Sequence, residues 1–124
     1  MKSYKDLEIY TLSLSLFYKT HTLSLKLPKY ELYELGSQIR RSADSVVSNI
    51  VEGYGRKQYK ADFLKFLTYS HASNLETLCH LEKIINLYPN VVGEVKLLQK
   101  NYDILGAKIY TFIKYVKNHW NDFD

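Results

Sequence analysis

The sequence has few residues that interrupt helices or cross-link chains. It contains 2 prolines, 5 glycines and 1 cysteine in 124 residues. A single cysteine, Cys79, excludes an internal disulfide and fits a reducing compartment. The uncharged run 9–18 is too short to span a bilayer and too rich in serine to resemble a signal peptide. We therefore expect a cytoplasmic protein with no membrane association.

Catalytic and metal-binding patterns are also missing. Di-iron helical bundles use Glu-x-x-His pairs, whereas Glu76 and His80 are four residues apart and have no second copy. No serine has a recognisable histidine partner, and the Arg-x4-His motif of helical ribonucleases is absent. Gly53-x-Gly55 lacks the strand and lysine of a phosphate loop. The sequence predicts a non-enzymatic protein without metal or cofactor.

The sequence does contain many apolar residues at helical spacing. Aliphatic and aromatic residues, counted together with alanine and cysteine, make up 46% of the chain. This apolar content is enough for one core in a single domain, 1–124. The periodicity predicts helices at about 6–27, 31–52, 58–88 and 91–118. Pro28 and Pro89 separate helices, and Gly53 is placed as a C-terminal stop. Short connections predict an all-α, antiparallel up-down-up-down four-helix bundle.

The second, third and fourth predicted helices each have one clear core face. In the last of them, at about 91–118, the apolar residues are spaced alternately by 4 and 3 positions, as in coiled-coil packing. The expected core residues are Leu32, Leu35, Ile39, Ala43, Val46 and Ile50; Phe63, Phe66, Leu67, Leu78, Leu81, Ile84 and Ile85; and Val91, Val95, Leu98, Tyr102, Leu105, Ile109, Phe112 and Val116.

The first predicted helix is apolar on two opposite faces. One stripe comprises Leu7, Tyr10, Leu14, Phe17, His21 and Leu25, and the other comprises Ile9, Leu12, Leu16, Leu23 and Leu27. Such a helix must be covered twice. One interpretation is an oligomer interface formed by Ile9, Leu12, Leu16 and Leu23. The alternative is burial of both faces within one bundle.

The second predicted helix carries a polar stripe opposite its core face, made of Gln38, Arg41, Ser45, Ser48, Asn49 and Glu52. It is interpreted as a solvated face, a packed polar seam or a ligand site. Gln38, Asn49, Glu52 and Glu76 are candidates for a structural polar network. Glu76 could pair with Arg41 or Arg40 across the bundle; alternatively it is exposed without a fixed partner.

A basic loop follows the second helix. Arg56, Lys57, Lys60 and Lys65 lie near Tyr54 and Tyr59. Cationic side chains neutralise phosphates, and tyrosine stacks on unpaired bases. The net charge of +4 is compatible with a polyanion partner but does not require one. The predicted nucleic-acid contacts are Arg40, Arg41, Arg56, Lys57 and Lys60, and the alternative is a solvated loop.

Several of these segments together resemble a bacterial family. The matching segments are Tyr4–Leu7 with Tyr10; Leu27–Lys29 with Glu31 and Leu35; Ser37–Ala43; Ser48–Gly53 with Gly55 and Arg56; Asp62, Phe63, Phe66 and Leu67; and Ser73 with Glu76. The chain resembles the four-helix-bundle proteins encoded in intervening sequences of large-subunit ribosomal RNA genes, which are often labelled ribosomal-protein-like. The accessory protein of diversity-generating retroelements belongs to the same group.

The resemblance implies a homo-oligomer, typically a pentamer. For the retroelement members it also implies binding to nucleic acid and to a reverse transcriptase. The chain departs from the family pattern at Tyr10, Val47 and Ala72, where tryptophan, proline and glycine are usual. We expect a non-enzymatic oligomer that presents basic surface to RNA, DNA or a ribonucleoprotein; the alternative is a module that docks a partner protein and has no nucleic-acid role.

Overall fold

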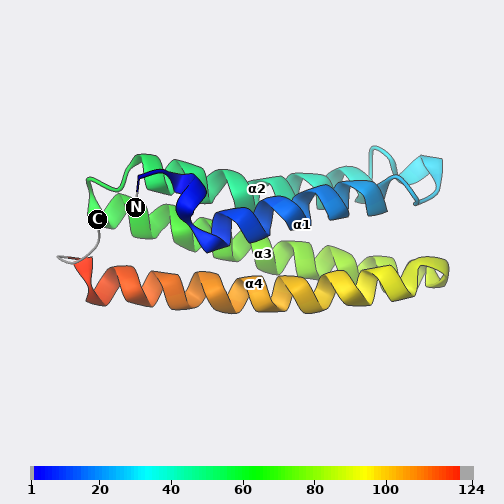
Figure 1. Ribbon diagram of the computed structural model, residues 1–124. Coiled ribbons are helices and arrows are strands. Elements are labelled where there is room, and N and C mark those ends of the chain that lie inside the picture. Colours follow the sequence, from blue (N-terminus) through cyan, green and yellow to red (C-terminus); the bar gives the residue numbers. More distant parts are fainter. Residues whose placement is uncertain (1, 121–124) are drawn as a thin grey trace.

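Four long helices form an elongated bundle in the computed structural model, which describes residues 2–120 (Figure 1). The helices are α1 (Glu8–Ser24), α2 (Leu35–Gly55), α3 (Lys60–Leu87) and α4 (Val92–Asn118). Consecutive helices pack against each other, α2 and α3 most extensively, and α4 returns to pack against α1. The predicted all-α antiparallel bundle is confirmed, and the described range contains no strand.

The core consists of the apolar faces predicted for α2, α3 and α4. Ile39, Val46, Phe63, Leu105 and Val116 are completely inaccessible to solvent. Phe66, Leu78, Ile85 and Phe112 are half-buried. The prediction for Leu32 is wrong, because it lies in the connection before α2 and is 37% exposed.

The chain reaches α1 through a separate turn, η1 (Tyr4–Asp6), rather than by the continuous helix predicted from residue 6. Ser3 and Asp6 form a capping box around this turn. Leu7 then adopts an extended backbone, with φ −78° and ψ 125°, and its side chain is buried. The break at Leu7 therefore lets its side chain enter the core before α1 begins.

The predicted boundaries of the second helix are wrong at both ends. Residues Lys29–Glu31 form a separate turn, η2, and α2 begins only at Leu35. At the other end α2 continues through Gly53 to Gly55, and neither glycine has a positive φ. A Cβ on Gly53 would lie 3.1 Å from the Cβ of Phe66. Gly53 thus permits close packing of α2 against α3 and does not end the helix.

The two apolar faces of α1 have different surroundings. Ile9, Leu16 and Leu23 are at most 4% exposed, and Leu12 is half-buried against the same core. The interpretation of these four residues as an oligomer interface is corrected, because the core of their own chain already covers them. The opposite face is more open, and Leu25 on it is 58% exposed.

The helices are too polar to cross a membrane. Within residues 2–120, no helix combines the length and the hydropathy that a bilayer span requires.

Candidate nucleic-acid interface

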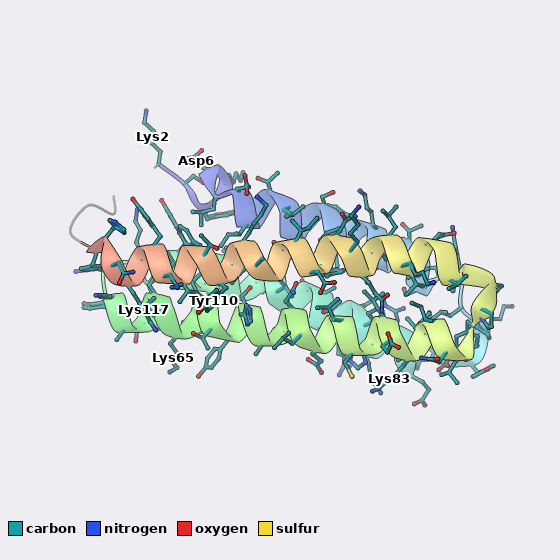
Figure 2. The ribbon with its side chains drawn as sticks, turned by 90° about the horizontal axis from the view of Figure 1, so that it is seen from below. Lys2, Asp6, Lys65, Lys83, Tyr110 and Lys117 are labelled. Carbon is teal, nitrogen blue, oxygen red and sulfur yellow. The ribbon has the colours of Figure 1, made fainter. Side chains whose placement is uncertain are left out.

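Two distant segments that carry basic residues meet at one end of the bundle. The Nζ atom of Lys60, in the first turn of α3, donates a hydrogen bond to the Lys117 carbonyl oxygen at 3.0 Å. This contact joins the α2–α3 connection to the C-terminal end of α4. Figure 2 shows Lys65 and Lys117 toward this end, with Lys83 toward the opposite end. We call the surface formed by Arg56, Lys57, Lys60, Lys65, Lys114 and Lys117 the basic end.

Arg56 is the most constrained cation of the basic end. Its guanidinium lies 3.1 Å from a Glu52 carboxylate oxygen and 3.7 Å from one of Asp62, and it covers the Phe66 ring at 4.9 Å. The Arg56 side chain is still 47% exposed. These contacts hold the guanidinium in place, but two carboxylates offset its charge.

Lys57 and Lys60 have neutral partners. The Lys57 Nζ donates to the Tyr54 hydroxyl at 3.0 Å and lies 4.4 Å from the centre of that ring. Lys60 donates to a backbone carbonyl. A neutral oxygen orients an ammonium without cancelling its charge, and two N–H donors of each ammonium remain for a phosphate. The loop predicted from sequence is therefore an ordered, half-solvated turn.

Arg40 and Arg41, the other two predicted nucleic-acid contacts, lie outside the basic end. Arg40 donates to the Ser24 hydroxyl at 2.9 Å and to the Leu32 carbonyl oxygen at 2.6 Å. It connects the end of α1 to the chain just before α2, and we leave it out of the basic end. Arg41 is exposed on α2 and has no hydrogen bond or ion pair with any described residue. The expected group of five cations is thus not one surface.

The polar stripe of α2 divides into two parts. Gln38, Arg41, Ser48 and Glu52 are exposed, as the solvated-face interpretation expects. Ser45, in contrast, shares a hydrogen bond of 2.8 Å with Ser73 of α3. Asn49 donates to the Ser45 carbonyl and hydroxyl oxygens, both at 2.9 Å. The inner edge of the stripe is therefore a packed polar seam between α2 and α3.

Two buried contacts extend this seam beyond the predicted stripe. The Thr77 hydroxyl donates to the Ser42 hydroxyl at 2.8 Å, and the Ser70 hydroxyl donates to the Val46 carbonyl oxygen at 2.7 Å. We call the three cross-helix contacts of Ser42, Ser45 and Ser70 the hydroxyl seam. The polar groups are satisfied by protein partners, so the seam is a structural element and not a ligand site.

Glu76 does not form the predicted cross-bundle pair with Arg40 or Arg41. Its carboxylate oxygen Oε2 lies 3.6 Å from the Nε2 atom of His80 on the same helix, and its side chain is 61% exposed. His80 is buried, and neither ring nitrogen has a hydrogen-bond partner among residues 2–120. Burial, followed by the charge of Lys83, lowers the pKa of His80 more than Glu76 raises it. The surroundings of His80 therefore favour its neutral form.

A row of aromatic rings lies on α4 near the basic end. The rings of Phe112 and Tyr115 are 6.4 Å apart with planes 19° from parallel, and those of Tyr115 and His119 are 4.8 Å apart at 17°. We call these three residues the ring row. Phe112 and Tyr115 also line a cavity of about 690 Å³ between the start of α1 and α4. The sequence analysis missed this row, although its i, i+3 and i+7 spacing was a visible signal.

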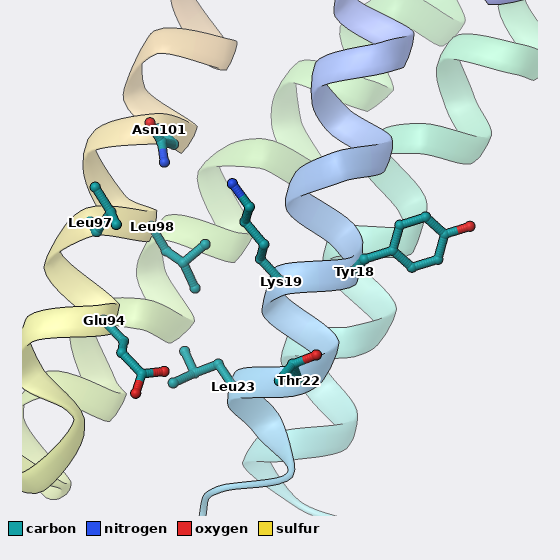
Figure 3. Close-up of a pocket in the computed structure, with 8 residues that line it drawn as sticks. All are labelled: Tyr18, Lys19, Thr22, Leu23, Glu94, Leu97, Leu98 and Asn101. Atoms are coloured by element: carbon teal, nitrogen blue, oxygen red, sulfur yellow. The ribbon is translucent and has the colours of Figure 1, made fainter.

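The α1–α4 side has a second, mostly apolar cavity of about 360 Å³ toward the other end of the bundle (Figure 3). Leu23, Leu97 and Leu98 line it, and the Lys26–Glu94 ion pair, 2.8 Å, lies beside it. In Figure 3 the Tyr18 ring points away from α4. The part of the chain that the structure describes contains no group of three or more histidine, cysteine or acidic side chains suited to a metal ion.

The comparisons with known proteins give one result. A family model described as 23S rRNA-intervening sequence protein matches residues 5–111. No curated protein matches the chain. The matched range includes the α2–α3 turn and the hydroxyl seam, and it ends just before the ring row.

Proposed function

The chain belongs to the 23S rRNA-intervening sequence protein family, and from this premise we propose that it is a non-enzymatic, oligomeric protein that associates with RNA through its basic end. The family description names no catalytic activity. It connects the protein with ribosomal RNA, which makes RNA the first polyanion to consider. The observation that supports the proposal most directly is the hydrogen bond from Lys60 to the Lys117 carbonyl, which joins two distant segments that both carry lysines.

The basic end fits contacts to phosphates better than recognition of base edges. Lys65, Lys114 and Lys117 have no ion pair with a described residue, and Lys57 and Lys60 keep their full charge beside neutral oxygens. Glu52 and Asp62 are the acidic residues that pair within this surface. Ammonium groups neutralise phosphates without reading sequence. Binding through this end is therefore expected to be salt-sensitive and largely independent of sequence.

We also propose that several copies act together. One chain offers only a few phosphate contacts, so its affinity for RNA is expected to be weak at physiological salt. A symmetric assembly that places several basic ends on one side would raise the overall affinity without new contacts. The resemblance seen in the sequence implies five copies. Mass measurement in solution at low and high salt tests this part of the proposal.

The central experiment measures binding to structured RNA across a range of salt concentrations. A double variant, Arg56→Glu with Lys57→Glu, reverses two charges of the basic end. It should weaken binding and reduce the slope of log K against log salt by about 1 for each phosphate that the variant no longer neutralises. The matched control, Lys29→Glu with Lys83→Glu, makes the same charge change toward the other end of the bundle.

Two results would contradict the proposal. If the wild-type protein does not bind RNA at low salt while its assembly is intact, the RNA association is wrong. If both double variants weaken binding equally, overall charge and not the basic end is responsible. Circular dichroism of each variant shows whether the helices persist, which is expected because the Arg56 ion pairs are exposed and contribute little to stability.

A second candidate function is docking of a partner protein without a nucleic-acid role. The cavity lined by Leu23, Leu97 and Leu98 favours it, since Leu97 is 61% exposed beside this cavity. Exposed apolar side chains next to a concave surface are common at protein interfaces. Tight protein binding that is insensitive to salt and abolished in Leu97→Glu would support this function over RNA association.

A further inference from the structure

We propose that the ring row of α4 stacks against an unpaired base, so that single-stranded RNA is the form of RNA that this protein prefers. This inference rests on the proposed function and specifies its substrate class. The ring row lies beyond the range matched by the family model, residues 5–111. The site is therefore assigned from the geometry of this chain alone.

The row combines one ring that packs against the core, Phe112, with two exposed rings. Tyr115 lies between the other two rings, within about 20° of parallel to each. Offset parallel rings at 4.5–7 Å are the favoured aromatic geometry, and a nucleobase continues such a stack in the same way. Tyr115 is 42% exposed and His119 is exposed, whereas the neighbouring Val116 is completely buried. Tyr115 and His119 thus present aromatic surface to solvent.

The neighbouring cavity gives the base a place to lie. Its wall comprises Leu7 and Ile9 from the start of α1, together with Ile104, Phe112 and Tyr115 from α4. A volume of about 690 Å³ is within the usual range for small-molecule sites. The apolar wall and the Tyr115 ring suit the two faces of a base, which are themselves apolar.

Two lysines beside the cavity are available to a phosphate backbone. Lys2 and Lys5 lie in and beside η1, and their side chains have no ion pair with any residue in the described range. Asp6 accepts backbone N–H groups of Lys2 and Ser3, and Glu8 pairs with Lys108 at 2.6 Å. Lys108 thus offsets the charge of Glu8, whereas Asp6 keeps its charge beside neutral N–H donors. Figure 2 shows Lys2 and Lys117 at the same end of the molecule, so phosphates on either side of a stacked base would meet cations.

This arrangement distinguishes single strands from duplexes. Bases in a duplex are covered by their neighbours, and the deep major groove of A-form RNA does not admit side chains. A ring can continue a stack only where a base is unpaired, as in loops, bulges and ends. The cations of the basic end contact either form, whereas Tyr115 and His119 add affinity for unpaired nucleotides alone.

The test compares a single-stranded RNA of about 12 nucleotides with a duplex of the same length. Tyr115→Ala should lower affinity for the single strand about tenfold and leave duplex affinity within about twofold, since one base stack is removed. Tyr115→Phe, which keeps the ring, should restore single-strand binding. The control is Tyr33→Ala, because Tyr33 is 84% exposed and lies in the α1–α2 connection, at the end of the bundle opposite the C-terminal end of α4 (Figure 1). Trp120, the one tryptophan of the chain, provides a fluorescence signal close to the site.

The outcomes separate this inference from the proposed function. If Tyr115→Ala and His119→Ala both leave single-strand affinity unchanged while charge reversal at Arg56 and Lys57 weakens it, the stacking site is wrong and the RNA association stands. If Tyr115→Ala weakens both RNA forms equally, the ring supports the fold and does not bind a base. If neither RNA form binds the wild-type protein, both proposals fail.

Discussion

The hydroxyl of Tyr88 donates a hydrogen bond to the buried carboxylate of Glu31, joining the α3–α4 connection to the α1–α2 connection. The other oxygen of this carboxylate accepts the backbone N–H of Leu35, at 3.4 Å. The Tyr30 hydroxyl is 2.9 Å from that of Tyr88. The bond to Glu31, followed by that to Tyr30, raises the pKa of Tyr88, so this hydroxyl remains a donor throughout the physiological range.

We expect Tyr88→Phe to lower the thermal midpoint of unfolding. The variant keeps the ring but leaves one oxygen of the buried Glu31 carboxylate without its donor, and an unmade hydrogen bond to a buried charge is destabilising. Thermal denaturation followed by circular dichroism measures the effect. Tyr33→Phe is the control, since Tyr33 is 84% exposed. Equal midpoints for Tyr88→Phe and the control would show that the contact contributes nothing.

Two glycine-to-alanine substitutions should have opposite effects. A Cβ on Gly36 would lie 2.7 Å from the Glu31 carbonyl oxygen, so Gly36→Ala forces the η2 turn away from α2. We expect a loss of about 1–3 kcal/mol in unfolding free energy. A Cβ on Gly93 would meet no atom within 4 Å, so Gly93→Ala should stabilise α4 by about 0.4–1 kcal/mol. Urea denaturation of the two variants tests both signs.

The buried hydrogen bond between Tyr102 and Thr20 leads to a third prediction. The two hydroxyl oxygens are 2.7 Å apart, and burial raises the pKa of Tyr102 to about 12 although the bond to Thr20 acts in the opposite direction. Tyr102→Phe leaves the Thr20 hydroxyl without this partner and should lower the unfolding free energy by about 1–2 kcal/mol.

Thr20→Val supplies the second half of a double-mutant cycle with Tyr102→Phe. The double variant leaves neither hydroxyl unpaired, so it should lose less stability than the sum of the single variants. Strict additivity in urea denaturation would mean that the two hydroxyls do not interact in solution.

His80 predicts a dependence of stability on pH. Because its pKa is lowered in the folded protein from the ordinary value of 6.5, the unfolded chain binds a proton more readily. Well above pH 6.5 the imidazole is neutral in both states and its titration costs no stability; as the pH falls through and below 6.5, the unfolded chain takes up the proton first and the folded state loses stability. Unfolding free energies measured between about pH 7.5 and about pH 5.5 should therefore decrease. His80→Gln should flatten this slope.

The sequence was sufficient for the fold but ambiguous about the surroundings of individual residues. The 4, 3 spacing in α4 predicted a buried face correctly, because periodicity reports which residues share a side. Periodicity alone could not show which apolar face of α1 points into the bundle, because that depends on where α4 packs. Gly53 was misassigned because glycine permits both helix ends and close helix packing, and only the position of Phe66 distinguishes the two.

The candidate site was harder to predict for the same reason. The basic residues of the α2–α3 loop were identified from sequence, and Arg56 and Lys57 have partners nearby in the chain, but other predicted cations have partners that local spacing does not reveal. Lys60 contacts the Lys117 carbonyl, and Arg40 contacts the Leu32 carbonyl and Ser24. Such contacts decide whether a cation is available to a ligand, and no local pattern encodes them.

The hydroxyl seam has a consequence for the alignment of the two most extensively packed helices. Apolar side chains tolerate sliding, because one leucine contact resembles the next. Sliding α2 along α3 by one turn, about 5.4 Å, would break the cross-helix contacts of Ser42, Ser45 and Ser70 together. The seam therefore selects one alignment of α2 along α3, because its three contacts form together only there. In that alignment the α2–α3 turn lies at the end of the bundle where Lys60 contacts the Lys117 carbonyl.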